Sequence, residues 1–484
     1  MSQLFDTAKP LPRAVILAVQ LQGTPDAEFA SSLEEISRLG KTLGLSIIGR
    51  VTQKRSRLAP GIVIGEGKLE ELARWTGGSG KVHVGPPQTK KNTRNRGGEA
   101  KAEPDEAERE VETSTAEEGD TVAAAAQRAE PNANETLPPD ERAGVVLVDH
   151  DLSPSQARNL ENATGVEVID RSGVILAIFQ RHARSREARM QVEIARLQYV
   201  APRLRASSLG EDRQGGGIGA KGAGESSAEL DRRKIRDRIA ELRQELAAIE
   251  RDSSTRRKRR GELNKVALVG YTNAGKSSWM RALTGSEVLV QDKLFATLDT
   301  TVRALAPETT PRILVSDTVG FIKKLPHDLV ASFRSTLDEA RECDLLIHVV
   351  DAADAAFPSQ IEVTREVLHD IQADESPSLL VLNKSDRISP EERERLATHY
   401  PNAFVLSCRD KADIAKLHAA IAAHFERHMA EADFVIPYAL SKLVAEAHAT
   451  ARVVSEQHKE DGTHLRVKAA PDQLAKLQAA LNKH

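Results

Sequence analysis

The stretch Gly270-Tyr-Thr-Asn-Ala-Gly275-Lys276-Ser277 directly follows the apolar run Lys265–Val269 and precedes a segment with helical periodicity. A strand, a glycine-rich turn and a helix in this order predict a phosphate-binding loop. Its glycines let backbone N–H groups surround phosphates, and the N-terminus of the following helix adds positive potential. We expect Lys276 to reach the β- and γ-phosphates of a nucleotide and the Ser277 hydroxyl to bind Mg²⁺.

A second motif, Asp317-Thr-Val-Gly320, follows the predicted strand Ile313–Val315. An aspartate at such a strand end can hold the water shell of Mg²⁺, and the Gly320 N–H can sense a γ-phosphate. The segment Phe295–Thr301 before it has no strong secondary-structure pattern and is predicted to be a switch loop. Either Thr297 or Thr301 must supply the second protein oxygen to Mg²⁺, and we favour Thr297.

Two later motifs predict which base is bound. Asn383-Lys-Ser-Asp386 follows the apolar strand Leu379–Leu382, and Ser407-Cys-Arg409 follows Phe404–Leu406. The Asp386 carboxylate can accept hydrogen bonds from both guanine N1–H and the exocyclic amine, a pair of donors that adenine does not offer. Four motifs in this order, each at the carboxyl end of a strand, predict a P-loop domain that binds GTP and hydrolyses it to GDP and phosphate.

The composition is that of a soluble chain with several domains. Its 484 residues exceed what one core supports, so roughly two to four domains are expected. The two cysteines, Cys343 and Cys408, lie far apart, which argues against a disulfide framework or a zinc site and favours a reducing cytosol. No apolar run approaches the roughly 18 residues of a membrane span, and Ala14–Val19 is too short for a signal peptide. We therefore expect a cytoplasmic protein without integral membrane association.

Residues 1–184 alternate strand and helix patterns, which predicts a parallel sheet covered by helices. The predicted elements, in chain order, are strand Ala14–Leu21, helix Asp26–Leu45, strands Leu45–Val51 and Gly61–Ile64, helix Lys68–Trp75, strand Gly144–Asp149, a helix opening near Ser153, strand Val166–Ile169 and a helix around Gly173–Gln180. The pattern stops at about 77–141, and within it residues 99–120 include ten acidic and two basic side chains. Such a segment buries too little apolar surface to offset its chain entropy, so we expect disorder, either as a solvated insertion or as a regulatory or RNA-attracting tail.

Residues 185–262 change to a helical period, with a first helix that is predicted to break at Pro202 and a second helix after it. Their apolar stripes, which predict an antiparallel helical hairpin, are Met190, Ile194 and Leu197 on the first helix and Leu230, Ile235, Ile239, Leu242, Leu246 and Ile249 on the second. The glycine-rich connection 213–224 is either a floppy loop or a tip that lets backbone approach a crowded polyanion. The cationic run Arg256–Arg260 is either a solvated linker or a contact to a phosphate backbone.

The chain is thus predicted to be a multidomain α/β protein. Its predicted parts are an N-terminal α/β domain at 1–184 with the acidic insert at about 77–141, an antiparallel helical hairpin at 185–262 with a glycine-rich tip at 213–224, a GTPase domain with a mostly parallel sheet at 263–428, and a small C-terminal α+β domain at 432–484. The last part has the pattern of a strand, a helix, a hairpin and a helix, with Glu460-Asp461-Gly462 as the turn.

Together these motifs resemble those of the HflX GTPases, in the Obg-like branch of translation-associated P-loop GTPases. The matching stretches are Arg213-Gln-Gly-Gly-Gly-Ile-Gly, Gly270-Tyr-Thr-Asn-Ala-Gly-Lys-Ser, Leu294-Phe-Ala-Thr-Leu-Asp, Asp317-Thr-Val-Gly-Phe and Leu325-Pro-His-Asp-Leu-Val. With the N-terminal α/β pattern, the resemblance covers the chain except for the insert at about 77–141, and the C-terminal part matches only loosely.

The resemblance implies a cytosolic GTPase that binds the large (50S) ribosomal subunit and separates stalled or idle ribosomes under stress. It implies that the N-terminal domain and the hairpin approach the peptidyl-transferase region, which would give the glycine-rich tip and Arg256–Arg260 a role in binding rRNA. It also places Thr297 on Mg²⁺ and Phe295–Asp299 along the nucleotide. We expect a monomer that does not bind DNA.

The residues expected to contact nucleotide or metal are Gly270, Tyr271, Thr272, Asn273, Ala274, Gly275, Lys276, Ser277, Ser278, Phe295, Ala296, Thr297, Leu298, Asp299, Asp317, Thr318, Val319, Gly320, Asn383, Lys384, Ser385, Asp386, Ser407, Cys408 and Arg409. Among these, Lys276, Thr297 and Gly320 are expected to act in hydrolysis. Ser277 and Thr297 are expected to bind Mg²⁺ directly, and Asp317 through water.

The predicted site lacks one catalytic part. Many GTPases place a glutamine directly after the glycine of the second motif, but here that residue is Phe321, which cannot orient water. Slow intrinsic hydrolysis is therefore expected, with a completing group supplied by the ribosome or by K⁺ near the phosphates. Asn273 is the candidate K⁺ ligand, although an asparagine there also suits the geometry of the loop. His327 is more simply structural than catalytic.

Two other functions are compatible with the sequence. One is an RNA-remodelling ATPase, but residues 1–184 offer only Gly65-Glu-Gly67-Lys68, which is too short for a phosphate loop. The other is a GTP-gated regulator with a protein partner outside the ribosome. Sedimentation with large ribosomal subunits separates both from the ribosomal function.

Overall fold

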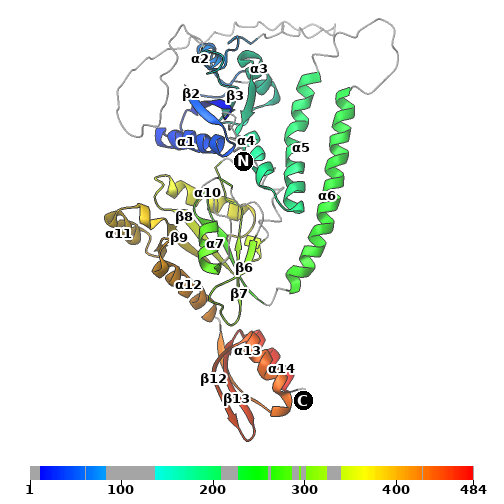
Figure 1. The fold of residues 1–484 in the computed structure, drawn as a ribbon, viewed down its shortest axis with the longest axis vertical. Helices are drawn as coiled ribbons and strands as arrows, with labels where there is room; N and C mark the ends of the chain where they lie inside the picture. Colours follow the sequence, from blue (N-terminus) through cyan, green and yellow to red (C-terminus); the bar gives the residue numbers. More distant parts are fainter. Residues whose placement is uncertain are drawn as a thin grey trace, which may run out of the picture.

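A computed structural model describes residues 11–59, 61–82, 137–208, 227–259, 263–285, 294–295, 301–323, 339–427 and 429–482. Within these ranges the chain forms three sheets and a pair of long helices. The three sheets follow one another along the long axis of the molecule in chain order, and the helix pair lies alongside the first two (Figure 1).

The N-terminal part is a four-stranded parallel sheet in the order β2-β1-β3-β4, with its helices packed around it. Its elements are β1 Arg13–Leu21, α1 Asp26–Thr42, β2 Ser46–Arg55, α2 Glu66–Thr76, β3 Val145–Val148, α3 Pro154–Thr164, β4 Glu167–Asp170 and α4 Arg171–His182. Strand β1 is buried on both faces, which explains its unbroken apolar run. The first helix ends earlier than Leu45, because Gly44 adopts a left-handed conformation just beyond it.

The prediction of a strand at Gly61–Ile64 is wrong. Val63 and Ile64 are buried in the core, which produced the apolar pattern, but the segment joins no sheet. Side chains satisfy its backbone instead, since the amide of Asn159 donates to Gly61 O at 2.8 Å and Arg55 donates to Val63 O at 3.5 Å. At the ends of the predicted insert, residues 77–82 and 137–141 belong to the described fold, whereas 83–136 lie outside the described residues.

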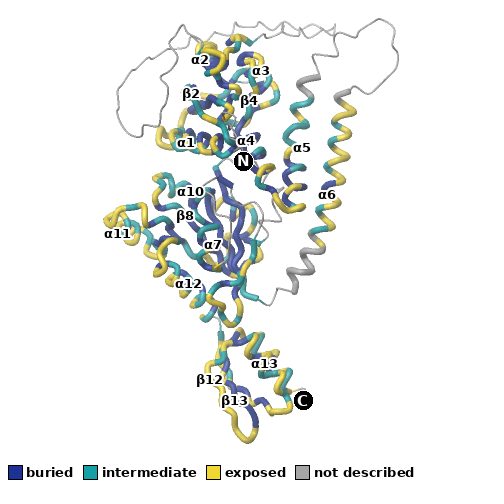
Figure 2. Tube along the Cα trace, in the orientation of Figure 1, coloured by how far each residue is buried: buried dark blue, intermediate teal, exposed yellow. Residues whose placement is uncertain are grey.

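The helix pair consists of α5 Arg186–Ser208 and α6 Ser227–Arg259, which lie side by side (Figure 1). Met190, Ile194 and Leu242 are buried between them, while Leu230 is exposed and does not extend the stripe. Two ion pairs join the helices, Arg186–Glu245 at 2.8 Å and Arg238–Glu193 at 3.1 Å. The earlier residue of α5 pairs with the later residue of α6, so the two helices run in opposite directions. Most described side chains of α6 are exposed, whereas those of α5 are mostly buried or intermediate (Figure 2).

Helix α5 does not break at Pro202, contrary to the prediction, and continues to Ser208. Contacts made by Tyr199 and Arg203, on either side of the proline, offset the hydrogen bond lost with the proline N–H. The guanidinium of Arg203 lies 3.5 Å from the Tyr199 ring centroid and donates to Tyr199 O at 3.0 Å, and both side chains bind the carboxylate of Asp170. These contacts fix the helix around the proline and fasten α5 to the N-terminal sheet.

The third part is a six-stranded sheet in the order β10-β9-β8-β5-β7-β6, parallel except where β6 pairs with β7. Its elements are β5 Asn264–Val269, α7 Lys276–Thr284, β6 Thr301–Ala304, β7 Ile313–Asp317, β8 Leu345–Asp351, α10 Phe357–Asp370, β9 Ser378–Asn383, η1 Ser385–Arg387, α11 Pro390–His399, β10 Ala403–Val405 and α12 Lys411–Glu426. The motif-bearing segments all leave this sheet at the carboxyl ends of parallel strands, where ligands of such sheets bind.

The C-terminal part is a three-stranded antiparallel sheet in the order β11-β13-β12 with helices on one side (Figure 1). Its elements are β11 Ala430–Ile436, η2 Tyr438–Leu440, α13 Ser441–Thr450, β12 Arg452–Lys459, β13 Gly462–Ala469 and α14 Pro471–Leu481. Its apolar residues form a separate core around Phe434, Leu465 and Val467.

The two long helices connect to different parts of the molecule. Helix α5 contributes Ala188, Val192 and Ala195 to the core of the N-terminal sheet. Helix α6 ends at Arg259, and the chain enters β5, a central strand of the six-stranded sheet, at Asn264.

Candidate functional site

The phosphate-loop motif lies between β5 and α7, as predicted. Gly270 has a φ of 142°, and a Cβ there would lie 2.1 Å from Val349 O. Gly275 has a φ of 101°, and its Cβ would lie 2.3 Å from the amide nitrogen of Asn383. Both positions therefore exclude any residue with a side chain. The glycines bring the loop backbone against β8 and the guanine motif, which fixes the loop relative to both.

Lys276, the first residue of α7, is buried under the loop. Its Nζ donates to Gly270 O at 3.1 Å and to Tyr271 O at 2.9 Å. Burial lowers the pKa of Lys276 to about 8, and the charge of Asp317 partly opposes this effect. The ammonium group therefore lies within the loop, where the phosphates of a nucleotide would approach.

GTP binding should weaken as the pH rises above about 8, where Lys276 loses its proton. Bound phosphates stabilise the ammonium and raise its pKa again, so binding above pH 8 requires proton uptake, whereas binding below pH 8 does not. The affinity should then fall by up to about tenfold per pH unit. Nucleotide titrations between about pH 6.5 and about pH 9 test this expectation, with Lys276→Met as the variant that should lose the slope. An affinity of the native protein that stays constant across this range would contradict it.

The predicted Mg²⁺ ligands Ser277 and Asp317 lie together. The hydroxyl of Ser277 donates to Asp317 Oδ2 at 2.7 Å, and Asp317 is fully buried at the end of β7. Both groups are oxygen donors of the kind that Mg²⁺ prefers, so these residues fit the ion. Thr301 begins β6 and pairs in register with Asp317. Thr297 lies outside the described residues, as do Ala296, Leu298 and Asp299.

Within the described ranges, no group of three or more histidine, cysteine, aspartate or glutamate side chains could hold a metal ion. Phe295, the one described residue of the predicted stretch 295–299, has its side chain against Phe179 of α4, with ring centroids 4.6 Å apart. This part of the predicted switch loop therefore contacts the N-terminal part of the molecule.

The second motif lies directly against the phosphate loop. A Cβ on Gly320 would lie 2.8 Å from the Cα of Thr272 and 3.0 Å from Lys276 Nζ. The next residue, Phe321, accepts from Thr272 N at 2.8 Å, and its side chain is buried in the core beneath the sheet. A buried phenyl ring held in this way cannot orient a water molecule, which supports the expectation of slow intrinsic hydrolysis. His327 lies outside the described residues.

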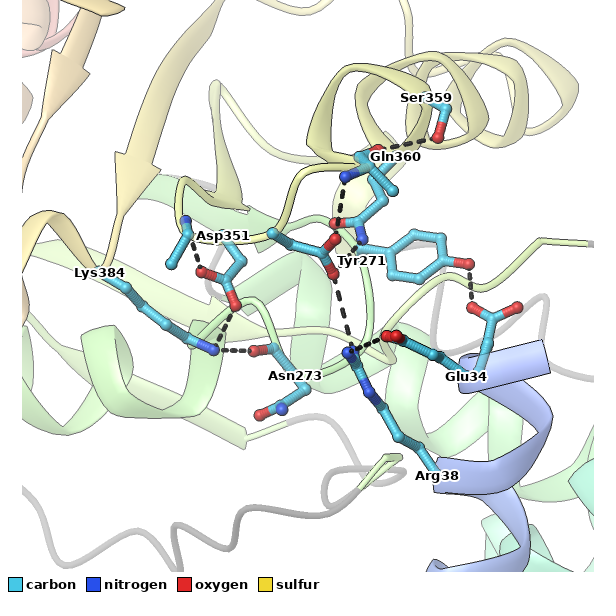
Figure 3. A network of polar contacts seen from close by, with 12 residues as sticks. Glu34, Arg38, Tyr271, Asn273, Asp351, Ser359, Gln360 and Lys384 are labelled. Atoms are coloured by element: carbon cyan, nitrogen blue, oxygen red, sulfur yellow. Dashed lines mark hydrogen bonds and ion pairs between the residues drawn. The ribbon is translucent and has the colours of Figure 1, made fainter. Parts of the chain in front are cut away.

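The guanine motif follows β9 and is fastened to the phosphate loop. The amide of Asn383 donates to Ala274 O at 2.8 Å, and Lys384 Nζ donates to Asn273 O at 2.9 Å (Figure 3). Lys384 also pairs with Asp351 at 2.6 Å. These contacts set the distance between the phosphate subsite and the base subsite.

Asp386 is oriented by the third short motif. Ser407 donates its hydroxyl to Asp386 Oδ1 at 2.7 Å, and Arg409 Nη1 lies 3.4 Å from Asp386 Oδ2. Burial alone would raise the pKa of Asp386, but the hydrogen bond from Ser407 and the nearby arginine charge lower it below its ordinary value. The carboxylate is therefore ionised and fixed, as an acceptor of two guanine donors must be.

The structure adds two residues that sequence reasoning missed. Asp351 ends β8 and holds Lys384, and Asp413 of α12 accepts from Ser407 N at 2.9 Å. Asp351 could have been found, because it directly follows the apolar run Leu345–Val350, as the other motifs follow apolar strands. Asp413 lies within a helix and has no local signal of its own.

Residues of the N-terminal part lie next to the phosphate loop. Arg38 of α1 pairs with Glu34 at 3.2 Å and with Asp354 at 3.7 Å, next to Tyr271 and Gln360 (Figure 3). A polar cavity of about 40 Å³ lies between the two parts, with room for about one water molecule. In the described part of the chain, no helix is long and apolar enough to cross a membrane.

Three family models match the chain. The GTP-binding GTPase N-terminal model matches residues 30–83 and 123–180, the GTP-binding GTPase middle-region model matches 182–260, and the 50S ribosome-binding GTPase model matches 265–384.

Curated relatives extend this similarity over the full chain. GTPase HflX of Gluconacetobacter diazotrophicus is 52% identical over 477 residues, which cover 99% of this chain and 99% of that protein. GTPase HflX of Escherichia coli strain K12 is 41% identical over 325 residues, or 66% of this chain and 76% of that protein. The crystal structure of a GTP-binding protein from Sulfolobus solfataricus in complex with GDP has a TM-score of 0.40 and 20% identity, covering 85% of this chain and 98% of that one. The family resemblance stated from the motifs is thereby confirmed, and the chain belongs to the HflX family of GTP-binding GTPases.

Proposed function

We propose that this GTPase binds the large ribosomal subunit in its GTP-bound form, separates stalled or idle ribosomes, and leaves after hydrolysis. The observation that carries the proposal is the helix pair α5 and α6. Helix α6 contains eleven lysines and arginines against seven acidic residues, in a chain whose net charge is −3. Exposed cations along a long helix suit an rRNA backbone. The name of the matched model, a 50S ribosome-binding GTPase, supports the same partner.

On this proposal the hairpin, with its glycine-rich tip at 213–224, enters the rRNA of the subunit. The tip and Arg260 lie outside the described residues, so their roles remain predictions from the sequence. The exposed residues Arg233, Lys234, Arg236 and Arg238 on α6 support an rRNA contact along the shaft of the helix. The protein would act in the cytoplasm, as a monomer.

Sedimentation through a sucrose gradient tests the ribosomal partner. With a non-hydrolysable GTP analogue the protein should travel with large subunits, and with GDP it should remain at the top. Asp386→Asn is the matched control, since it should lose the analogue and remain at the top in both cases. If the native protein stayed at the top with the analogue, the ribosomal proposal would be wrong, and a GTP-gated regulator of another partner or an RNA-remodelling protein would replace it.

The hydrolytic site is proposed to be incomplete until it meets the ribosome. Mg²⁺ would be held by Ser277 directly, by Asp317 through water and by Thr297, and it would supply positive charge that offsets the charge of the phosphates. Lys276 supplies a positive charge to the phosphates, and Gly320 supplies an N–H to the γ-phosphate. Phe321 offers nothing to the attacking water, so the subunit or a monovalent cation must supply the missing group.

K⁺ is the proposed cation, and GTP turnover should be several-fold higher in K⁺ than in Na⁺ buffer. The Asn273 carbonyl already accepts from Lys384, but its side-chain amide makes none of the contacts drawn in Figure 3. The side-chain oxygen of Asn273 is thus available to bind K⁺. Loop geometry is the alternative reason for an asparagine at this position, because its backbone is left-handed, with a φ of 60°. Steady-state turnover in matched K⁺ and Na⁺ buffers decides between them, and equal rates would assign Asn273 to loop geometry alone.

A further inference from the structure

Lys323, which follows the second motif, is held at both of its backbone polar atoms. Its N–H donates to the hydroxyl of Tyr271 at 2.8 Å. Its carbonyl accepts from Arg171 Nη2 at 3.1 Å and from Arg171 Nε at 3.3 Å. Tyr271 belongs to the phosphate loop and Arg171 to α4 of the N-terminal part. The described segment that begins at the second motif (residues 317–323, here called the second switch segment) is therefore held at Lys323 between two different parts of the molecule.

Glu35 of α1 completes the connection. It accepts a hydrogen bond from the Tyr271 hydroxyl and forms an ion pair with Arg171. Arg171 also pairs with Asp149 at 2.7 Å. Figure 3 shows the Tyr271 ring reaching from the loop towards α1. Glu35, Arg171, Tyr271 and the Lys323 backbone thus form a closed ring of polar contacts, here called the Glu35 ring.

The protonation states of the Glu35 ring fix who donates to whom. Burial and the neighbouring Glu35 charge raise the pKa of Tyr271 above its ordinary value, so the hydroxyl keeps its proton. Burial alone would lower the pKa of Arg171, but the Glu35 and Asp149 carboxylates outweigh it and raise it. A single hydroxyl proton is given to Glu35, which leaves the oxygen of Tyr271 to accept from Lys323 N. If any residue of the Glu35 ring moves away, a polar group of another residue in the ring loses its hydrogen-bond partner.

Apolar residues pack next to the Glu35 ring, which also borders the polar cavity through Glu35, Tyr271 and Lys323. Leu294, Val319 and Ile322 of the GTPase part belong to the same core as Val174 and Ile178 of α4. The Tyr271 side chain is 7% exposed and that of Arg171 1%. Polar contacts in such surroundings are strong when complete and costly when one partner is missing. The ring is therefore either formed or broken as a unit.

We infer that Tyr271 is a positioning residue that, through Glu35 and Arg171, ties the second switch segment to the N-terminal domain. Gly320 N–H is expected to follow the γ-phosphate, and Lys323 lies three residues beyond it in the sequence. When Gly320 moves, Lys323 must either carry Glu35 and Arg171 with it or break the ring. A change of bound nucleotide and a change in the docking of the N-terminal domain are then coupled to each other. The inference rests on GTP binding by this family and does not depend on the ribosomal proposal.

Amide exchange of the isolated protein tests the connection. Tyr271→Phe keeps the ring packing and removes only the hydroxyl. Exchange at Lys323 should become about five- to tenfold faster, as for the loss of one hydrogen bond. In the native protein, exchange in α1 around Glu35 should differ between the GDP state and the state with a non-hydrolysable GTP analogue, and the variant should abolish that difference. If α1 showed no nucleotide dependence in the native protein, or kept it in Tyr271→Phe, the inference would be overturned.

A double-mutant cycle distinguishes a shared network from separate structural effects. Glu35→Gln and Tyr271→Phe should each shift the ratio of GDP affinity to GTP-analogue affinity by about fivefold in the same direction. The double variant should shift it no further than either single one, because both break one network. Glu34→Gln, the same change at the exposed neighbour of Glu35, should leave the ratio unchanged. Additive shifts, or an equal shift in Glu34→Gln, would reject the Glu35 ring as the link.

Discussion

Replacing Asp386 by asparagine should lower the affinity for GTP by roughly a hundred- to a thousandfold and raise the affinity for xanthosine triphosphate. The carboxylate is ionised and held by the Ser407 hydroxyl at 2.7 Å. Guanine presents two donors to it, and an amide at this position turns an N–H₂ group towards at least one of them. The result is an unpaired donor on each side, whereas xanthine presents a carbonyl where guanine has its amine.

Equilibrium titration of both nucleotides against the native protein and the variant measures this exchange of preference. Asp410→Asn is the matched control, since Asp410 caps α12 by accepting from Ala412 N at 2.8 Å and takes no part in the base subsite. It should leave both affinities unchanged. A GTP affinity in Asp386→Asn equal to that of the native protein would remove Asp386 from the base subsite.

Replacing Arg171 by methionine should destabilise the N-terminal part by about 3–5 kcal/mol. Its side chain is 1% exposed and pairs with two carboxylates, Asp149 and Glu35, which are 1% and 12% exposed. Removing the cation leaves both negative charges buried without their partner. Ser32 donates to Asp149 at 2.6 Å, but a neutral hydroxyl does not replace the lost positive charge.

Native-state hydrogen exchange of the β1 amides reports this loss, because that central strand opens only when the whole N-terminal sheet unfolds. Lys54→Met is the control in the same sheet. Lys54 pairs with Asp26 on the surface, where both side chains are more than two-thirds exposed, so its loss should have little measurable effect. Equal protection of β1 in Arg171→Met and in the native protein would show that the buried charges find other partners.

The candidate nucleotide site could be predicted from the sequence because each of its motifs is local. Gly270–Ser277 carries its glycines, its lysine and its helix start within one short stretch. The carboxyl ends of parallel strands then bring Asp317 and Asn383 to the same edge, as the alternation of strands and helices predicted. The backbone conformation places most of these residues, and that conformation is strongly indicated by local sequence.

The contacts between domains had no such signal. The Glu35 ring joins residues more than a hundred positions apart in several cases, and each stands in an ordinary helical or loop pattern. Two smaller errors have the same origin. Gly61–Ile64 looked like a strand because tertiary packing buries a loop, and Pro202 was expected to end a helix that contacts to Asp170 hold together. In each case long-range packing overrode a local preference.

Because α5 and α6 are attached to different domains, a small movement between the domains produces a larger displacement at the far end of the helix pair. With 33 residues, α6 is about 50 Å long. A rotation of about 5° at its base would displace its far end sideways by about 4 Å, or about three-quarters of the pitch of a helical turn. Because α5 is fastened to the N-terminal sheet and α6 continues into β5, a change of angle between the domains becomes a sliding of one helix along the other. A movement of a fraction of an ångström at a phosphate would thus be magnified into a displacement of several ångströms at the far end of α6.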